Sequence, residues 1–177
     1  AHRPMRNFML IVGSFAMIDR STNVDGRWTC GAVRYRLKAK PLIVHCCHCT
    51  WCQRESGSAF AVNAVIEASQ VELQHGRPIK ATLPSASGKG QVFWRCADCG
   101  VTVWSNYPQA GPRIHFIRVG TLEEPARVPP DIHIYTSTKR PWGIIPDGVP
   151  AVPEFYKPAE VWSPDSLARF KAARAMP

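Results

Sequence analysis

Cys47-His48-Cys49-Thr50-Trp51-Cys52 places three thiols within six residues. Sulfurs so close in sequence converge only if the backbone coils around one point, and a zinc ion about 2.3 Å from each sulfur supplies that point. Three protein ligands leave one tetrahedral position open, as in catalytic zinc sites. The alternative is a closed structural site whose fourth ligand is Cys46 or a distant residue. The run therefore predicts a zinc site around which the chain must fold.

A second group of cysteines lies elsewhere in the chain. Cys96-Ala97-Asp98-Cys99-Gly100 predicts a zinc knuckle between two strands, with Gly100 at a positive φ. Cys30 offers a third ligand, but Trp28 occupies the position two residues earlier, where a partner is expected. The seven cysteines are odd in number and clustered, which favours metal ligation over disulfides. A redox dithiol is disfavoured because it needs a C-x-x-C pair at the start of the helix of a βαβ unit, and we expect no helix of that kind after either pair.

Length, composition and charge limit the class of protein. The chain has 177 residues, 45% of them hydrophobic, which is enough for one ordinary folded domain. We expect that domain at about 25–156, after a lead at 1–24 and before a tail at 157–177. The formal net charge of +9 is spread along the chain, so nucleic-acid binding is disfavoured and a small anionic substrate is favoured.

The N-terminal lead contains the longest apolar run, Phe8 to Ile18, which is eleven residues long. It is too short to span a membrane, and it resembles a signal peptide only weakly because Asp19 and Arg20 follow at once. We interpret the lead as non-native or disordered, with Met17 as an alternative start. Together with the clustered cysteines, this predicts a cytoplasmic protein without a membrane span.

Short alternating runs predict a mainly β chain. In Val33–Leu37, the apolar side chains at 33, 35 and 37 point one way and the arginines at 34 and 36 point to solvent. A helix is expected only at the C-terminus, where Ser163 caps it, Pro164 begins it, and Leu167 and Phe170 share one face. Further strands are expected at 42–44, 60–66, 71–73, 91–95, 101–104, 114–119 and 132–136, with a flexible turn at 84–90.

Taken in order, these motifs resemble the glutathione-dependent formaldehyde-activating family, which includes centromere protein V. The resemblance covers about residues 25–156. It implies the Mss4-like fold, in which several small coiled β-sheets surround zinc-binding loops. The matching segments are Gly26 to Tyr35, Cys47 to Cys52, Ser56 to Phe60, Cys96 to Gly100, Val119 to Leu122 and His133 to Tyr135.

The resemblance also implies two Zn²⁺ sites. Cys47, Cys49 and Cys52 match the catalytic-type zinc, and Cys30, Cys96 and Cys99 match three of the four ligands of a structural zinc. Trp28 stands where the family has the fourth cysteine, so this second site is incomplete. It either recruits water or another side chain, or it is empty and the indole fills the vacated volume.

The function that the resemblance implies is that of a zinc-dependent carbon–sulfur lyase acting on an S-(hydroxymethyl)glutathione-type adduct. Glutathione, or another small anionic thiol, would be its partner. Another thiol or aldehyde is possible, and the alternative function is a non-catalytic zinc-binding module for protein partners. Neither a general base nor an oligomeric state can be assigned. The candidate substrate-binding residues are His48, Trp51, Arg54 and Lys89. His48 lies behind the ligands, faces the substrate or is a surface histidine. His45 is interpreted as structural or surface, and His133 as a structural histidine of a strand.

Overall fold

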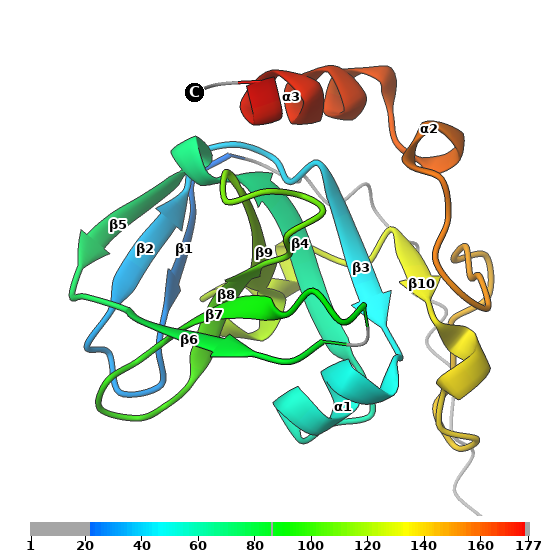
Figure 1. The fold of residues 1–177 in the computed structure, drawn as a ribbon, viewed down its shortest axis with the longest axis horizontal. Coiled ribbons are helices and arrows are strands. Elements are labelled where there is room, and N and C mark those ends of the chain that lie inside the picture. The colour runs from blue at the N-terminus through cyan, green and yellow to red at the C-terminus, as the bar shows by residue number, and fades with distance from the viewer. Residues whose placement is uncertain (1–21, 86, 176–177) are drawn as a thin grey trace, which may run out of the picture.

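The computed structural model describes residues 22–85 and 87–175, which form two β-sheets (Figure 1). The expectations about Phe8–Ile18 and Met17 fall outside these residues. The smaller sheet has the order β1-β2-β5 and the larger has the order β10-β3-β4-β9-β8-β7-β6. The strands are β1 (Val24–Arg27), β2 (Arg34–Leu37), β3 (Ile43–Cys47), β4 (Ala61–Glu67), β5 (Val71–His75), β6 (Ile79–Leu83), β7 (Gln91–Arg95), β8 (Thr102–Asn106), β9 (Ile114–Arg118) and β10 (Ile132–Ile134).

The smaller sheet confirms the alternation expected around residue 35. On β2, Tyr35 and Leu37 are buried, whereas the Arg36 guanidinium lies at the surface and pairs with Asp25 on β1, with Nε 2.6 Å from Oδ1. Residue 26 must be glycine, because a Cβ at this position would lie 2.3 Å from the Tyr35 ring. The Tyr35 ring therefore occupies the space that a side chain at residue 26 of β1 would otherwise fill.

Strand β3 is longer than the short strand expected at 42–44, and it carries the first two cysteines of the cluster. It runs antiparallel to β4 and parallel to β10. Because side chains alternate along a strand, Cys46 and Cys47 point to opposite faces of the sheet. Val44 packs in the apolar core shared with the smaller sheet, whereas Cys47 packs in a second core with Ile132 and Ile134. β3 therefore separates the two apolar cores.

The expectation that a helix occurs only at the C-terminus is wrong, because α1 (Thr50–Ser56) begins directly after Cys49. The Cys49 sulfur caps this helix by accepting the Cys52 N–H at 3.4 Å, and Gly57 ends it at a φ of 64°. Seven residues are too few for a clear amphipathic period, so the pattern could not predict it. The strands that α1 joins are antiparallel, so the βαβ unit of a redox dithiol is not present here.

The helix predicted at the C-terminus is present in the structure. Ser163 caps α3 (Pro164–Ala175) by accepting the Ser166 N–H at 3.1 Å, and Leu167 and Phe170 pack against the second core. The helix packs against β4 and β9 and lies at the end of the molecule opposite α1 (Figure 1). Helix α3 therefore packs on the larger sheet. The remaining helices are α2 (Pro158–Val161) and four short 3-10 helices at Ala68–Gln70, Val119–Thr121, Pro125–Arg127 and Thr136–Thr138.

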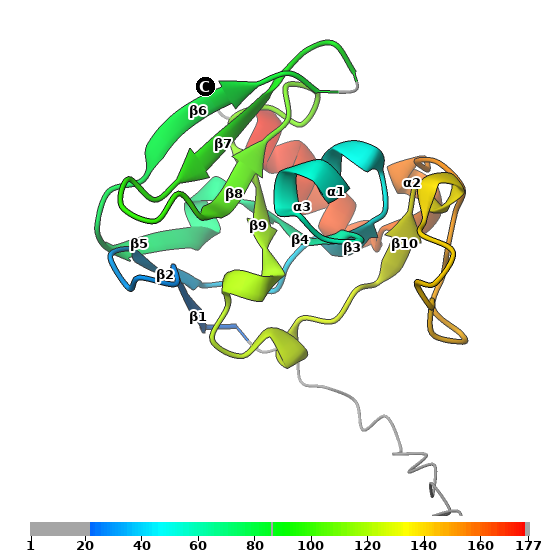
Figure 2. The same ribbon diagram turned by 90° about the horizontal axis from the view of Figure 1, so that it is seen from below.

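The smaller sheet and the β10–α2 edge lie on opposite sides of the central strands (Figures 1 and 2). Between them, β3, β4 and β9 run side by side in the larger sheet, and α1 connects β3 to β4. Among the described residues, none of the helices combines the length and apolar character needed to cross a membrane.

Candidate metal centre and cavity

The sulfurs of Cys47, Cys49 and Cys52 converge, and we call these residues the trithiol group. Their Sγ atoms all lie within 4.8 Å of one another, and tetrahedral zinc would hold its sulfurs about 3.8 Å apart. One sulfur comes from the end of β3, the second from the cap of α1 and the third from its first turn. Cys47 and Cys52 are buried, but Cys49 is half-buried, so the group is open on one side. The donor set therefore fits a metal such as zinc.

The three thiols of the trithiol group influence one another. Interactions with the Cys47 and Cys52 side chains lower the pKa of the Cys49 thiol, and interactions with Cys49 and Cys52 raise the pKa of the Cys47 thiol. A divalent cation at the centre would stabilise three thiolates at once. Burial, followed by the charge of the nearby thiolates, raises the pKa of the Tyr107 phenol well above its usual value.

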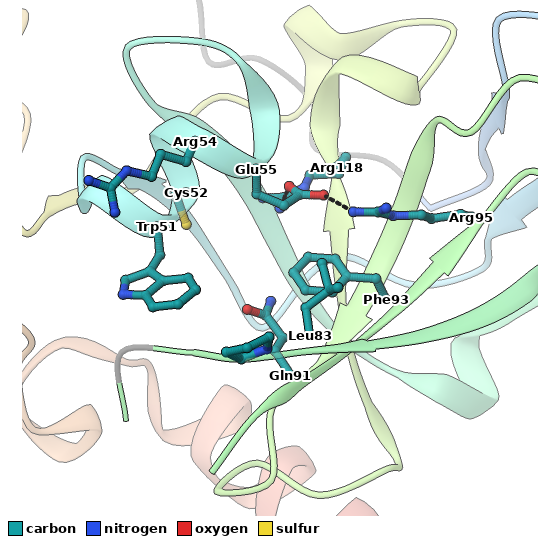
Figure 3. Close-up of a pocket in the computed structure, with 10 residues that line it drawn as sticks. Trp51, Cys52, Arg54, Glu55, Leu83, Gln91, Phe93, Arg95 and Arg118 are labelled. Carbon is teal, nitrogen blue, oxygen red and sulfur yellow. Dashed lines mark hydrogen bonds and ion pairs between the residues drawn. The ribbon is translucent and has the colours of Figure 1, made fainter. Parts of the chain in front are cut away.

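A cavity of about 320 Å³ adjoins the trithiol group, because Cys52 is part of its wall (Figure 3). Trp51, with 39% of its surface exposed, lines the cavity together with Phe93. Arg54 also lines it, but its guanidinium points away from Glu55 and Arg95 (Figure 3). The cavity thus brings an aromatic wall and several charges beside one of the sulfurs. The full lining consists of Trp51, Cys52, Arg54, Glu55, Leu83, Pro84, Gln91, Phe93, Arg95 and Arg118.

An ion cluster centred on Glu55 forms part of this wall. The Glu55 carboxylate pairs with Arg118, both side chains being 12% exposed, and with Arg95 at 3.5 Å. Thr102 donates to Glu55 Oε1 at 2.8 Å, and Arg118 donates to Asn63 at 2.6 Å. The same three charged residues line a second cavity of about 520 Å³. The ion cluster therefore separates the two cavities.

Sequence reasoning missed the ion cluster. Glu55 and Arg118 are 63 positions apart, and only the antiparallel pairing of β4 with β9, which sets Asn63 opposite Arg118, brings them together. A lone glutamate beside Arg54 in the sequence carried no signal that it would bind a distant arginine.

The second cysteine group converges as well. The Cys30, Cys96 and Cys99 sulfurs lie within 4.8 Å of one another, with Cys30 and Cys96 3.4 Å apart. Cys30 and Cys99 are exposed, and Gly100 adopts a φ of 72°, as expected for the knuckle between β7 and β8. Among the described residues, no fourth metal-ligating side chain joins this group.

Trp28 occupies the core beside the second cysteine group. Its side chain is fully buried and packs in the same apolar cluster as Val33, Tyr35 and Cys96. The indole Nε1 has no hydrogen-bond partner. The tryptophan therefore fills apolar volume next to Cys96 and offers no ligand, so the site remains a three-thiol site.

The structure places His48, His45 and Lys89 in different surroundings. The surface interpretation of His48 is wrong: only 2% of the residue is exposed, and its ring stacks on that of His133 with centroids 5.1 Å apart. His45 is buried and bonds the Tyr156 hydroxyl through Nε2 at 2.5 Å, in line with a structural role. Lys89 is exposed in the turn between β6 and β7 and lines neither cavity described above.

A comparison with known protein families identifies the family of this chain. A sequence model of the glutathione-dependent formaldehyde-activating enzymes matches residues 23–138. The chain belongs to this family. The formaldehyde-activating family assignment confirms the resemblance seen in the sequence, and the mainly β architecture fits its Mss4-like fold. Helices α2 and α3 lie beyond the matched segment.

Other comparisons add little detail. A search of curated proteins found no match. Among solved structures, the crystal structure of a Rhodobacter sphaeroides protein is similar, with 20% sequence identity and a TM-score of 0.44. The alignment covers 72% of this chain and 99% of that one.

Proposed function

We propose that this member of the formaldehyde-activating family is a zinc-dependent carbon–sulfur lyase that acts on an S-(hydroxymethyl)glutathione-type adduct. One observation carries the proposal: Cys52 belongs to the trithiol group and also lines the cavity that holds three arginines. A metal held by the group would thus face a space in which a charged thiol can bind.

The trithiol group would hold the zinc, and its member Cys52 lines the cavity. When bound there, zinc stabilises a substrate thiolate and polarises a carbonyl oxygen, although three thiolates make it a weaker Lewis acid than a three-histidine site would. We propose the second group, Cys30, Cys96 and Cys99, as a weaker structural site, because it offers only three ligands.

Charge in the cavity supports an anionic substrate. Three arginines and one glutamate line it, which leaves an excess of two positive charges. Arg118 is engaged by Glu55 and Asn63, whereas the Arg95 side chain is 31% exposed and its guanidinium meets Glu55 only at 3.5 Å. Arg95 is therefore the better placed to pair with a carboxylate of glutathione. Trp51 and Phe93 supply apolar walls for the methylene groups.

The reaction breaks the bond between sulfur and the hydroxymethyl carbon. The electron pair of that bond goes to sulfur, the hydroxyl oxygen forms the carbonyl of the aldehyde, and the hydroxyl proton leaves. In the opposite direction, the thiolate attacks the aldehyde carbon and the oxygen takes up a proton. The cavity residues contribute by holding thiol and aldehyde next to each other, which removes much of the entropic barrier of a bimolecular step.

The proposal is tested by measuring how fast glutathione and formaldehyde exchange with their adduct, using NMR exchange spectroscopy with the zinc-loaded full chain. We expect acceleration that is lost in Cys49→Ser. Arg95→Gln should raise KM about tenfold or more, since a charge-assisted hydrogen bond contributes about 1.5–3 kcal/mol. Lys89→Gln removes a positive charge outside both cavities and is the matched control, with KM unchanged. If the zinc-loaded chain does not accelerate the exchange, the proposal is wrong, and the function is either a reaction of another thiol or aldehyde or that of a non-catalytic zinc-binding module.

A further inference from the structure

A third group of metal-ligating side chains lies on the opposite face of β3 from the trithiol group. It consists of Cys46, His48 and His133, and we call it the Cys46 group. In the parallel pairing of β3 with β10, Cys46 lies opposite His133, one position before the pair formed by Cys47 and Ile134. His48 follows β3 and is tied to β10 by its N–H, which donates to the Ile134 carbonyl at 3.0 Å. The strand register alone therefore brings these three residues together.

The ligating atoms of the Cys46 group are close and shielded from water. The Cys46 sulfur and the ring nitrogens lie within 4.8 Å of one another, and the residues are only 2%, 2% and 6% exposed. His48 Nε2 lies 3.7 Å from the Cys46 sulfur and 2.8 Å from His133 Nδ1. A tetrahedral zinc would set sulfur and nitrogen about 3.6 Å apart and the two nitrogens about 3.3 Å apart. The first separation is already met, and the second requires the rings to part by about 0.5 Å.

One buried ring nitrogen of the group lacks a hydrogen-bond partner. His48 Nδ1 has no partner, whichever tautomer the ring adopts. A fully buried imidazole held only by its neighbouring histidine leaves one of its two nitrogens unsatisfied, which costs about 1–3 kcal/mol. A metal bond to Nε2 would fix the ring proton on Nδ1, which stays an unpaired donor, so the site rests on the convergence of the three ligating atoms in a buried place.

We propose that the Cys46 group binds a Zn²⁺-class divalent ion through Cys46 Sγ, His48 Nε2 and His133 Nδ1. Loading releases the Cys46 thiol proton. The proton between the two rings moves to the other nitrogen of the ring that carries it, so that both ligating nitrogens present lone pairs. A cysteine and two histidines are a common zinc ligand set.

Charge balance favours this site next to the trithiol group. One thiolate, two neutral imidazoles and a divalent ion carry +1, whereas three thiolates and a divalent ion carry −1. Cys46 and Cys47 are adjacent, so the two centres would lie back to back across one strand with opposite charges. Each would reduce the electrostatic cost of burying the other.

Zinc stoichiometry of the full chain tests the proposal. Cys46→Ser, His133→Gln and the double variant should each bind one zinc fewer than the unsubstituted chain, because all three remove the same site. Combining Cys46→Ser with Cys49→Ser should remove two. His115→Gln is the matched control, because this buried histidine bonds Asn106 and belongs to no ligand group, so its zinc content should not change. Unchanged zinc content in both Cys46→Ser and His133→Gln would overturn the site.

A second measurement is spectroscopic. Among the described residues, the other two groups contain only cysteines, so imidazole scattering in the zinc X-ray absorption spectrum of the fully loaded chain that disappears in Cys46→Ser reports on the Cys46 group. Such scattering supports the site, and a spectrum with sulfur scattering alone overturns it, even if a variant fails to fold. Neither measurement depends on lyase activity.

Discussion

The Arg118 guanidinium is ion-paired with the Glu55 carboxylate inside the wall of the cavity, and both side chains are 12% exposed. The pair links the middle of the larger sheet to α1, the helix that carries Cys52. Its position is therefore tied to that of the trithiol group, and loss of either partner leaves a largely buried charge without compensation.

Replacement of Glu55 by Gln tests this link. The substitution leaves Arg118 without its carboxylate, and we expect the free energy of unfolding to fall by about 2–4 kcal/mol. Urea denaturation provides the measurement. Glu124→Gln removes the partner of Arg127 at a position 62% exposed and should change stability by about 0.5 kcal/mol or less. Equal effects of the two substitutions would contradict a structural role for the Glu55 pair.

Replacement of Cys49 by Ser should remove close to one zinc per chain, because the trithiol group would retain only two sulfurs. Cys52→Ser should remove the same equivalent, and the double variant no more than that. Elemental analysis of the purified protein measures the content. Cys30→Ser, in the other cysteine group, serves as the comparison: combined with Cys49→Ser, its loss should add. Unchanged zinc in Cys49→Ser would disprove the assignment.

Replacement of Trp28 by Cys should have two opposing effects. Removing a fully buried indole leaves a cavity and should cost about 3–5 kcal/mol in zinc-free protein. A fourth thiolate should then recover part of this loss when zinc is present and slow zinc release to a chelator. Melting temperatures with and without zinc, compared with Trp28→Ala, separate the two effects. If the Cys variant holds zinc no better than the Ala variant, Trp28 does not stand at a ligand position.

Acid should destabilise the fold through its buried histidines. Burial lowers the pKa of His115 to about 4, from 6.5 for the unfolded chain. The unfolded state therefore binds more protons between these values, so stability rises with pH across this window and is lost as pH falls from 6.5 to 4, by up to about 3 kcal/mol. His115→Gln should flatten the dependence in zinc-free protein, as measured by urea denaturation at pH 7.5 and pH 5. Parallel curves for variant and parent would refute the assignment.

Much of the candidate site could be predicted from the sequence, because its ligands are local. Cys47, Cys49 and Cys52 lie within six residues, and the knuckle at Cys96 and Cys99 closes over four, so spacing alone indicates convergence. The same holds for the C-terminal helix, whose cap at Ser163 is a local signal. Helix α1 could not be predicted from the apolar pattern, because its seven residues are too few to show a helical period.

The amino-acid sequence by itself determined the clustered thiols, the alternating strands and the family. The tertiary structure decided what surrounds the metal ligands. Glu55 meets Arg118 only through the pairing of β4 with β9, and Cys46 meets His133 only through the register of β3 with β10. A shift of one residue in either register would turn these side chains to the other face, and no short-range pattern encodes that choice. Ligands that share a turn are set by local geometry, whereas partners far apart in the chain depend on how whole strands pack.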